Sequence, residues 1–211
     1  MKNYQQTIEA FDKQAVAYQH FFMDLDLYNH TYDAFCELIP QANARIFEIG
    51  CGPGNITRYL LNKRPDLKIE ATDAAPAMVT LAQTNNPTAA CSLLDCRDLH
   101  KITGTYNGIV SGFCLPYLSR EDCEKLIKDV ADLLESGGIF YLSTLEGHYS
   151  NSGLESSSNG KYQAQVYYYQ EDYLQKVLKA NTLEAVQVFR EQMPKADGSV
   201  GTHLIILARK T

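Results

Sequence analysis

The sequence predicts an α/β fold in which a mostly parallel sheet is covered by helices on both faces. Between residues 44 and 145, short apolar segments alternate with segments of helical length, and this alternation is typical of a parallel sheet between two helical layers. The last two apolar segments, 183–192 and 203–208, are joined by a connection too short for a parallel crossover. We therefore expect these two strands to form an antiparallel hairpin.

The length and composition of the chain are those of one globular domain spanning residues 1–211. The net charge of −6 and the lack of a dense Lys/Arg cluster argue against a nucleic-acid partner. No apolar stretch approaches the roughly 20 residues that cross a bilayer, and the N-terminus lacks the apolar core of a signal peptide. We therefore expect a cytoplasmic protein with no membrane span, either a monomer or a homodimer.

The cysteines and histidines give no indication of a metal site. None of the six cysteines forms a Cys-x-x-Cys pair, and no cluster of His, Cys and Asp has the spacing of metal ligands. Several cysteines lie in apolar runs, as Cys114 does, so buried free thiols are expected. A magnesium site built from acidic residues scattered along the sequence stays open.

Helix and turn signals divide the chain into successive elements. The part before Pro40 reads as helical, because apolar residues recur there at helical spacing. Proline and glycine positions then mark the ends of the elements that follow. The expected strands are 44–49, 67–72, 89–94, 106–112 and 139–145, and the expected helices are 56–62, 75–83 and 120–134, with a turn at 135–138.

The alternation breaks down in the third quarter of the chain. Residues 147–161 are polar and rich in Ser, Asn and Gly, so a mobile loop is expected there. A tyrosine-rich strand at 162–169 and a helix at 171–179 should follow. We interpret 147–169 as an inserted lid that caps a substrate together with the N-terminal helices in 1–40.

A glycine-rich turn, Glu48-Ile49-Gly50-Cys51-Gly52-Pro53-Gly54, directly follows the first predicted strand. Alternate glycines let the backbone approach a ligand with no Cβ in the way. The next helix points its free N–H groups toward the same place. Such a turn alone is also typical of a tight strand-to-helix connection, so the polar residues after the later strands have to decide between the two.

Acidic residues follow the second and third predicted strands. Asp73 lies 19 residues after Gly54, where a carboxylate can accept hydrogen bonds from both hydroxyls of a ribose, although it could also cap the next helix. Asp95 can accept from an exocyclic adenine amine, while the N–H of Cys96 donates to a ring nitrogen. The alternative for Asp95 is an ordinary loop aspartate.

The segment 111–117 follows the fourth predicted strand. In open parallel sheets, ligands bind at the carboxyl ends of the central strands. Gly112 and Phe113 are therefore expected to face the reacting end of a nucleoside-type cofactor, with Phe113 as a core residue the alternative.

Taken together, these features resemble the class I S-adenosylmethionine-dependent methyltransferases, especially small-molecule members with type 11 or type 25 domains. Residues 47–57 look like motif I, Asp73 matches the motif II acid, Asp95-Cys96 match the adenine contacts, and 106–117 match motif IV. The resemblance is strongest over 46–145. It implies a Rossmann-like three-layer sandwich, with a seven-stranded, mostly parallel sheet that ends in the antiparallel hairpin.

By this resemblance the chain binds S-adenosylmethionine and releases S-adenosylhomocysteine. The predicted cofactor-binding residues are Tyr18, Glu48, Gly50, Cys51, Gly52, Asp73, Ala74, Met78, Asp95, Cys96, Gly112 and Phe113. Tyr18 belongs to an N-terminal pattern found before motif I in many small-molecule members, and would cover the methyl group. Packing in the core is an equally good interpretation for an aromatic residue on an apolar helix face.

Methyl transfer from a sulfonium is an in-line displacement with a good leaving group, so alignment can supply much of the catalysis, roughly 7–11 kcal/mol. A general base is needed only when the acceptor must lose a proton. His148 follows the fifth predicted strand and is the best placed of the five histidines, although a solvated loop histidine is the simpler interpretation. His20, Tyr117 and Tyr168 are expected to contact a small-molecule acceptor.

Three other functions share parts of this pattern. A nicotinamide-dependent oxidoreductase also uses a glycine-rich turn and a ribose carboxylate, but its Gly-x-Gly-x-x-Gly fingerprint requires glycine where this chain has Asn55. A non-catalytic S-adenosylmethionine-binding protein would keep the turn and Asp73 without turnover. Transfer of a different group from a related sulfonium, as in aminopropyl transferases, is also compatible with motif I.

Overall fold

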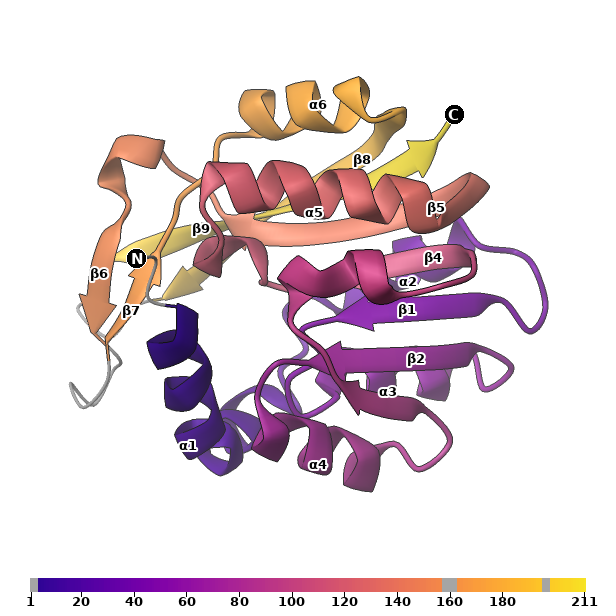
Figure 1. Ribbon diagram of the computed structural model, residues 1–211, viewed down its shortest axis with the longest axis horizontal. Helices are drawn as coiled ribbons and strands as arrows, with labels where there is room; N and C mark the ends of the chain where they lie inside the picture. Colours follow the sequence, from indigo (N-terminus) through magenta and orange to yellow (C-terminus); the bar gives the residue numbers. More distant parts are fainter. Residues whose placement is uncertain (1–3, 157–162, 195–197) are drawn as a thin grey trace.

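The computed structural model describes residues 4–156, 163–194 and 198–211. At its centre is a seven-stranded sheet in the order β3-β2-β1-β4-β5-β9-β8 (Figure 1). The strands are β1 (Arg45–Ile49), β2 (Lys68–Asp73), β3 (Ala90–Leu93), β4 (Tyr106–Ser111), β5 (Leu134–Leu145), β8 (Leu183–Pro194) and β9 (Val200–Lys210). Neighbours from β3 to β5 pair in parallel, whereas β9 is antiparallel to both β5 and β8. The predicted fold class and its antiparallel hairpin are confirmed.

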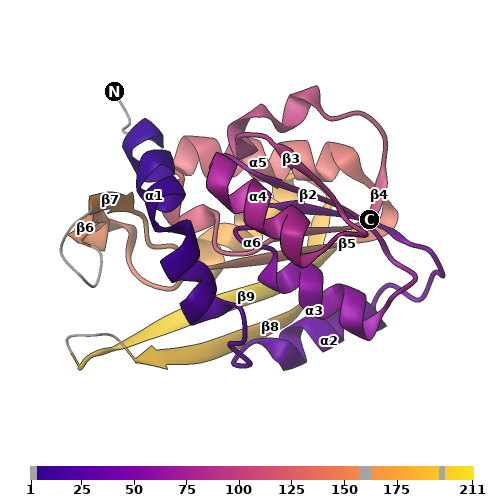
Figure 2. The same ribbon diagram turned by 90° about the horizontal axis from the view of Figure 1, so that it is seen from below.

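Helices cover both faces of this sheet (Figures 1 and 2). One face carries α2 (Asn29–Glu37), α3 (Asn55–Lys63) and α4 (Pro76–Asn85), and the other carries η1 (Cys96–Lys101), α5 (Arg120–Leu133) and α6 (Glu171–Ala180). Successive residues of β9 serve the two layers, because Ile205 packs with the first set and Ile206 with the second. None of the described helices is both long and apolar enough to cross a membrane.

The first helix lies outside this sandwich. α1 (Tyr4–Phe22) packs on α4, and the Asp12 carboxylate accepts a hydrogen bond of 2.7 Å from the backbone N–H of Ala77 in the first turn of α4. An aspartate at that point satisfies one of the N–H groups that a helix start leaves without a partner. This bond helps to hold α1 against α4.

The segment between β5 and α6 differs from the prediction. The prediction of a loop over 147–161 is wrong where the structure describes these residues, because η3 (Tyr149–Asn151) and β6 (Gly153–Ser156) form there. Residues 157–161 lie outside the described residues. β6 pairs antiparallel with β7 (Gln163–Val166) as a separate two-stranded sheet. These short polar strands carry no clear apolar alternation, which is the signal that sequence analysis uses to predict a strand.

The predicted turn at 135–138 lies inside β5. It interrupts the pairing with β4, in which Tyr106 pairs with Leu134 but Gly108 pairs with Ile139. Gly137 has a φ of +77°, which a glycine adopts without strain. The expected bend is present, as an irregularity within the strand.

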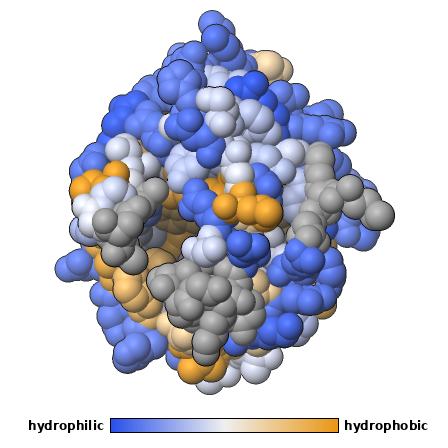
Figure 3. All heavy atoms as spheres, turned by 90° about the vertical axis from the view of Figure 1, so that its left-hand side faces the viewer, coloured by the Kyte–Doolittle hydropathy of each residue, from blue (hydrophilic) through white to orange (hydrophobic). Residues whose placement is uncertain are grey.

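The carboxyl ends of the parallel strands lie at one edge of the sheet. Because β9 is antiparallel, its N-terminal part reaches the same edge, where His203 pairs with Leu145 at the end of β5. α1 and the β6–β7 pair flank this edge on the left of Figure 1. Figure 3 looks onto that side of the molecule and shows a hollow with apolar walls.

Candidate active site

Two adjoining cavities lie at this edge of the sheet. The first cavity, about 860 Å³ with its mouth included, is lined by α1, the glycine-rich turn and the ends of β2, β3 and β4.

The three glycines of the turn after β1 have left-handed backbones, with φ of +65°, +55° and +83° at Gly50, Gly52 and Gly54. A Cβ on Gly52 would lie 3.6 Å from Cε1 of Tyr18, and both residues line the first cavity. A Cβ on Gly50 or Gly54 would instead collide with packed side-chain atoms at 2.1 and 2.3 Å. Gly52 thus keeps the cavity open, and the other two glycines allow close packing behind it.

Asp73 ends β2 and lines the first cavity. Its Oδ2 accepts from the N–H of Gly52 at 2.9 Å and its Oδ1 from the N–H of Ala75 at 2.8 Å. Burial raises the pKa of this carboxyl, and hydrogen bonds from the backbone N–H groups of Ala75, Gly52 and Ala74 oppose that effect. A carboxylate has about four acceptor sites, so Asp73 can still accept from a ligand hydroxyl.

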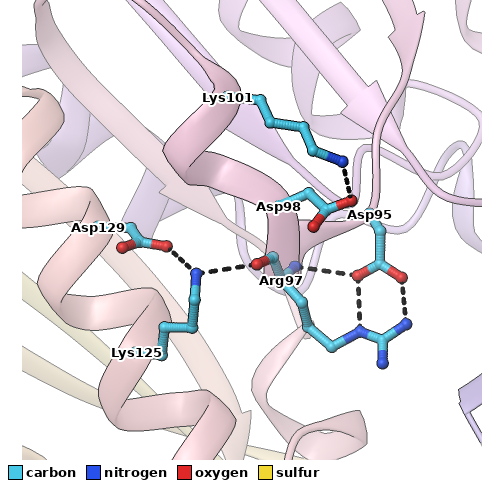
Figure 4. A network of polar contacts seen from close by, with 6 residues as sticks. All are labelled: Asp95, Arg97, Asp98, Lys101, Lys125 and Asp129. Atoms are coloured by element: carbon cyan, nitrogen blue, oxygen red, sulfur yellow. Dashed lines mark hydrogen bonds and ion pairs between the residues drawn. The ribbon is translucent and has the colours of Figure 1, made fainter.

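Asp95, after β3, is held by Arg97 (Figure 4). Its carboxylate accepts from the backbone N–H and from Nε of Arg97, each at 2.9 Å, and also from Nη2. The Arg97 guanidinium lies 4.1 Å from the ring centre of Tyr4, at the start of α1, and Lys125 donates to the Arg97 carbonyl. These contacts fix the orientation of Asp95 and tie the start of α1 to the same point.

The second cavity lies between the end of α1, the segment before α2, and the start of β9. It has a volume of about 820 Å³ with its mouth included. Tyr18, Gly52, Phe113 and Tyr117 line both cavities, so the two meet at these residues. The described residues that line the second cavity include no Lys, Arg, Asp or Glu.

A hydrogen-bonded pair of Tyr28 and His203 lies in the wall of the second cavity. The Tyr28 hydroxyl is 2.6 Å from Nδ1 of His203, and the two rings are nearly parallel, with centres 6.0 Å apart. The ring of Phe113 lies 4.9 Å from that of His203. Burial raises the pKa of Tyr28 above its ordinary value, so its phenol stays protonated at neutral pH.

Phe113 has a strained backbone. Its φ of +56° is in the left-handed region, which costs a non-glycine residue roughly 1–2 kcal/mol. Its N–H donates to Oγ of Ser143 on β5 at 2.9 Å, and this bond holds the conformation. The strain places the Phe113 ring where the two cavities meet, as strained residues at functional sites often do.

A family model described as "Methyltransferase domain" matches residues 46–138. The matched region includes the glycine-rich turn, Asp73, Asp95 and the segment after β4. Over these residues, which are less than half of the chain, the sequence is similar to a methyltransferase domain. The resemblance predicted from the motifs is thereby confirmed.

Curated relatives of this methyltransferase domain act on different kinds of molecule. The trans-aconitate 2-methyltransferase of Mycobacterium ulcerans is 42% identical over 52 residues, which are 25% of this chain and 20% of the relative. The malonyl-[acyl-carrier protein] O-methyltransferase of Bacillus anthracis is 28% identical over 140 residues, 64% of this chain and 51% of the relative. The chain thus spans between a fifth and about half of these relatives.

Solved structures of methyltransferases share the fold over nearly the whole chain. The Burkholderia thailandensis 1,6-didemethyltoxoflavin-N1-methyltransferase, solved with 1,6-didemethyltoxoflavin and S-adenosylhomocysteine, has a TM-score of 0.74 at 18% identity, covering 98% of this chain and 88% of the other. A Methanosarcina mazei methyltransferase has a TM-score of 0.71 at 17% identity, covering 83% and 96%. At such identities the agreement concerns the fold.

The structure brings most of the predicted cofactor-binding residues of the methyltransferase domain together. Those that line the first cavity are Tyr18, Gly50, Gly52, Asp73, Ala74, Met78, Asp95, Cys96, Gly112 and Phe113. Their placement agrees with the prediction, and their contacts with a cofactor stay a prediction. Tyr18 lines both cavities, with its ring 4.3 Å from that of Phe22.

Two of the predicted residues lie elsewhere. Cys51 lines the second cavity instead of the first. Glu48 lines neither cavity in the described structure: it is buried below the turn, where its Oε2 accepts from the Thr57 hydroxyl in the first turn of α3. The Glu48 side chain points from β1 toward α3. The sequence alone does not reveal this direction.

The predicted catalytic histidine lines neither of the two cavities. His148 is exposed and lines a separate, polar cavity together with Glu171 and Gln175. It follows β5 at the carboxyl edge, as predicted, but the chain there turns away toward α6. We therefore do not assign the proton-accepting role to His148.

Of the three predicted acceptor contacts, Tyr117 lines the cavities and the other two do not. Tyr117 lines both cavities, and its ring packs against that of Phe11 with centres 5.0 Å apart. His20 is exposed on α1 and lines neither cavity. Tyr168 also lies outside both, where its hydroxyl donates to Glu155 of β6 at 2.7 Å.

The sequence analysis counted His203 among five candidate histidines but preferred His148, and it did not single out Tyr28. A signal for His203 is present, because an antiparallel last strand must begin at the edge where the parallel strands end. Tyr28 has no comparable signal: it precedes α2 in a segment whose path depends on how α1 packs. Arg97, two residues after Asp95, was likewise not singled out, although a basic residue so close to an acid can pair with it.

Proposed function

We propose that this chain transfers a methyl group from S-adenosylmethionine to a small-molecule acceptor, releasing S-adenosylhomocysteine. The observation that carries the proposal is the meeting of the two cavities at Tyr18, Gly52, Phe113 and Tyr117. A methyl donor in the first cavity would have its reactive end at this boundary, and an acceptor in the second cavity would approach from the opposite side. In-line displacement requires that arrangement.

The residues of the first cavity fit the cofactor. Gly52 leaves room for the ligand against the turn, and the Asp73 carboxylate can accept from a ribose hydroxyl. Asp95 is oriented by Arg97 and keeps a lone pair on Oδ2 for an adenine amine. When bound, the cofactor supplies an electrophilic methyl on a positively charged sulfur, and the protein's part is to align it and exclude water.

The acceptor is proposed to be small because the second cavity is bounded by buried rings. Tyr28 and Tyr32 are each 5% exposed, and both lie in its wall. Residues of α1 line both cavities, which supports the expected role of the N-terminal helices as a substrate cap. The described part of 147–169 lines neither cavity. The assignment of 147–169 as a lid stays a prediction.

Calorimetric titration with S-adenosylmethionine, S-adenosylhomocysteine and NAD⁺ tests the cofactor assignment. We expect both sulfur compounds to bind and NAD⁺ not to bind, and to see matching shifts in thermal melts, because a ligand of the native state stabilises it. Binding of NAD⁺ alone would instead support the oxidoreductase. Formation of S-adenosylhomocysteine in a screen of small acceptors separates an enzyme from a protein that only binds the cofactor.

A further inference from the structure

The second cavity is suited to an uncharged ligand. Its described lining residues include no Lys, Arg, Asp or Glu, and His203 is uncharged in the form that can accept a proton. A carboxylate or phosphate placed there would lose its hydration with no opposite charge in compensation, which is costly in a partly enclosed site. A polycarboxylate such as aconitate therefore does not suit this cavity.

Aromatic rings form much of the wall. The rings of Tyr28 and Phe113 have centres 5.4 Å apart, and those of Tyr28 and Tyr32 are 6.4 Å apart. On the opposite side, Tyr18 and Phe22 form another pair. Offset and edge-to-face packing against such rings favours a planar aromatic ligand.

The His203 imidazole in this wall can accept a proton. Imidazole is the side chain whose ordinary pKa suits proton transfer near neutral pH. The hydroxyl oxygen of Tyr28 lies 2.6 Å from Nδ1 of His203. It can accept a hydrogen bond from the protonated His203 ring and so hold that ring in place. Glu191, the cross-strand partner of His203 on β8, is also titratable, and its carboxylate lies 3.1 Å from Nε2 of His30.

We propose that the second cavity binds a planar, uncharged aromatic acceptor carrying a weakly acidic hydroxyl, and that His203 takes the proton of that hydroxyl. The inference rests on the proposed function and specifies its acceptor. The acceptor oxygen bonds to the methyl carbon as the carbon–sulfur bond breaks, and sulfur keeps the electron pair. The acceptor's proton passes to the His203 imidazole, held by Tyr28, and is released to solvent after product leaves.

The test compares methyl transfer to 2-naphthol, 4-nitrophenol and trans-aconitate by the wild type and three variants, His203→Gln, Tyr28→Phe and His148→Gln. S-adenosylhomocysteine binding is titrated for each protein, so that loss of the cofactor site is distinguished from loss of the acceptor chemistry. His148→Gln is the matched control, because it makes the same chemical change at an exposed histidine outside both cavities. Thermal melts verify that each variant is folded.

We expect the wild type to methylate the phenols and not aconitate. His203→Gln should bind S-adenosylhomocysteine normally while its kcat for 2-naphthol falls by about 100-fold, the lower end of general-base effects. The fall should be smaller for 4-nitrophenol, which is the more acidic phenol and depends less on a base. Tyr28→Phe should show a weaker effect of the same kind, and His148→Gln should behave as wild type.

Several outcomes would overturn the proposal. An unchanged kcat in His203→Gln, or an equal fall with both phenols, would leave His203 a structural residue at most. Cofactor binding with transfer to aconitate, or to neither phenol, would contradict the acceptor class while leaving the proposed function standing. Failure of the wild type to bind S-adenosylhomocysteine would refute the proposed function itself.

Discussion

The Tyr28 hydroxyl lies 2.6 Å from Nδ1 of His203, although 175 residues separate them in the sequence. One residue precedes α2 and the other lies near the start of β9, so the contact joins the N-terminal helices to the antiparallel hairpin. It exists because β9 runs opposite to its neighbour β5 and brings its first residues to the carboxyl edge. The antiparallel strand β9 thus supplies a polar group to the wall of the second cavity.

Asp73→Asn should weaken S-adenosylhomocysteine binding by about tenfold or more. A charged carboxylate accepts stronger hydrogen bonds from the ribose hydroxyls than a neutral amide does. Asparagine keeps one carbonyl oxygen for the N–H of Gly52 or Ala75, so the variant should remain folded. Calorimetry measures the change. Asp132→Asn, at a largely exposed carboxylate paired with Lys128, is the control and should bind normally; equal affinities for the two variants would refute the ribose assignment.

Gly52→Ala should reduce cofactor affinity, because its Cβ enters the first cavity beside Tyr18. It should also lose roughly 1–2 kcal/mol of stability from the left-handed backbone. Gly137→Ala is a matched control: its φ is +77° and a Cβ there would meet nothing within 4 Å. Titrations and chemical denaturation should show similar destabilisation in both variants, with weaker binding in Gly52→Ala alone. Normal binding by Gly52→Ala would mean that the turn does not face the cofactor.

Glu48 should make the stability of the folded chain depend on pH. The residue is 1% exposed, and burial raises the pKa of its carboxyl from 4.5 to about 8. Between these values the folded state holds a proton that the unfolded state has lost, so stability is full below pH 4.5 and falls as pH rises toward 8. At about 1.4 kcal/mol per pKa unit, the loss is on the order of a few kcal/mol.

Glu48→Gln should remove this part of the pH dependence, because the amide stays neutral throughout. Denaturation at pH 5.5 and pH 8 measures it: the difference in unfolding free energy between the two pH values should shrink in the variant. Glu37→Gln, at an exposed carboxyl at the end of α2, should leave the difference unchanged. A wild-type protein that is more stable at pH 8 than at pH 5.5, with the same trend in Glu48→Gln, would contradict the prediction.

Arg97→Gln should weaken S-adenosylhomocysteine binding by about fivefold, the equivalent of about 1 kcal/mol, because Asp95 loses the charged partner that orients it. The contact with Tyr4 is lost as well, so the first turn of α1 should become more sensitive to protease. Lys101→Gln removes an exposed ion pair with Asp98 in the same short helix and is the control. Unchanged binding and proteolysis in Arg97→Gln would show that Asp95 needs no orienting partner.

The sheet and the cofactor side of the site could be predicted from the sequence because their signals are local. Alternation of strands and helices identifies a parallel sheet, and the turn after β1, Asp73 and Asp95 each follow their own strand. Carboxyl ends of parallel strands share an edge, so residues that follow strands must meet. The prediction of the first cavity needed no knowledge of how side chains pack.

The acceptor side could not be predicted in the same way, because its residues come from packing between distant segments. The position of His148 after β5 favours it in the sequence, whereas the structure places His203, near the start of β9, in the wall of the second cavity. Which histidine faces the site depends on the pairing of His203 with Leu145 and on the turn of the chain after Glu146. Glu48 shows the same limit within a motif, since its neighbours line cavities while its own side chain is buried.

A crystal structure of the chain with S-adenosylhomocysteine tests the central claim most directly. The account predicts ribose hydroxyls within hydrogen-bonding distance of the Asp73 carboxylate. It also predicts the sulfur at the boundary formed by Tyr18, Gly52, Phe113 and Tyr117, facing the cavity that His203 lines. A ligand bound away from Asp73, or one whose sulfur faces away from the second cavity, would contradict it.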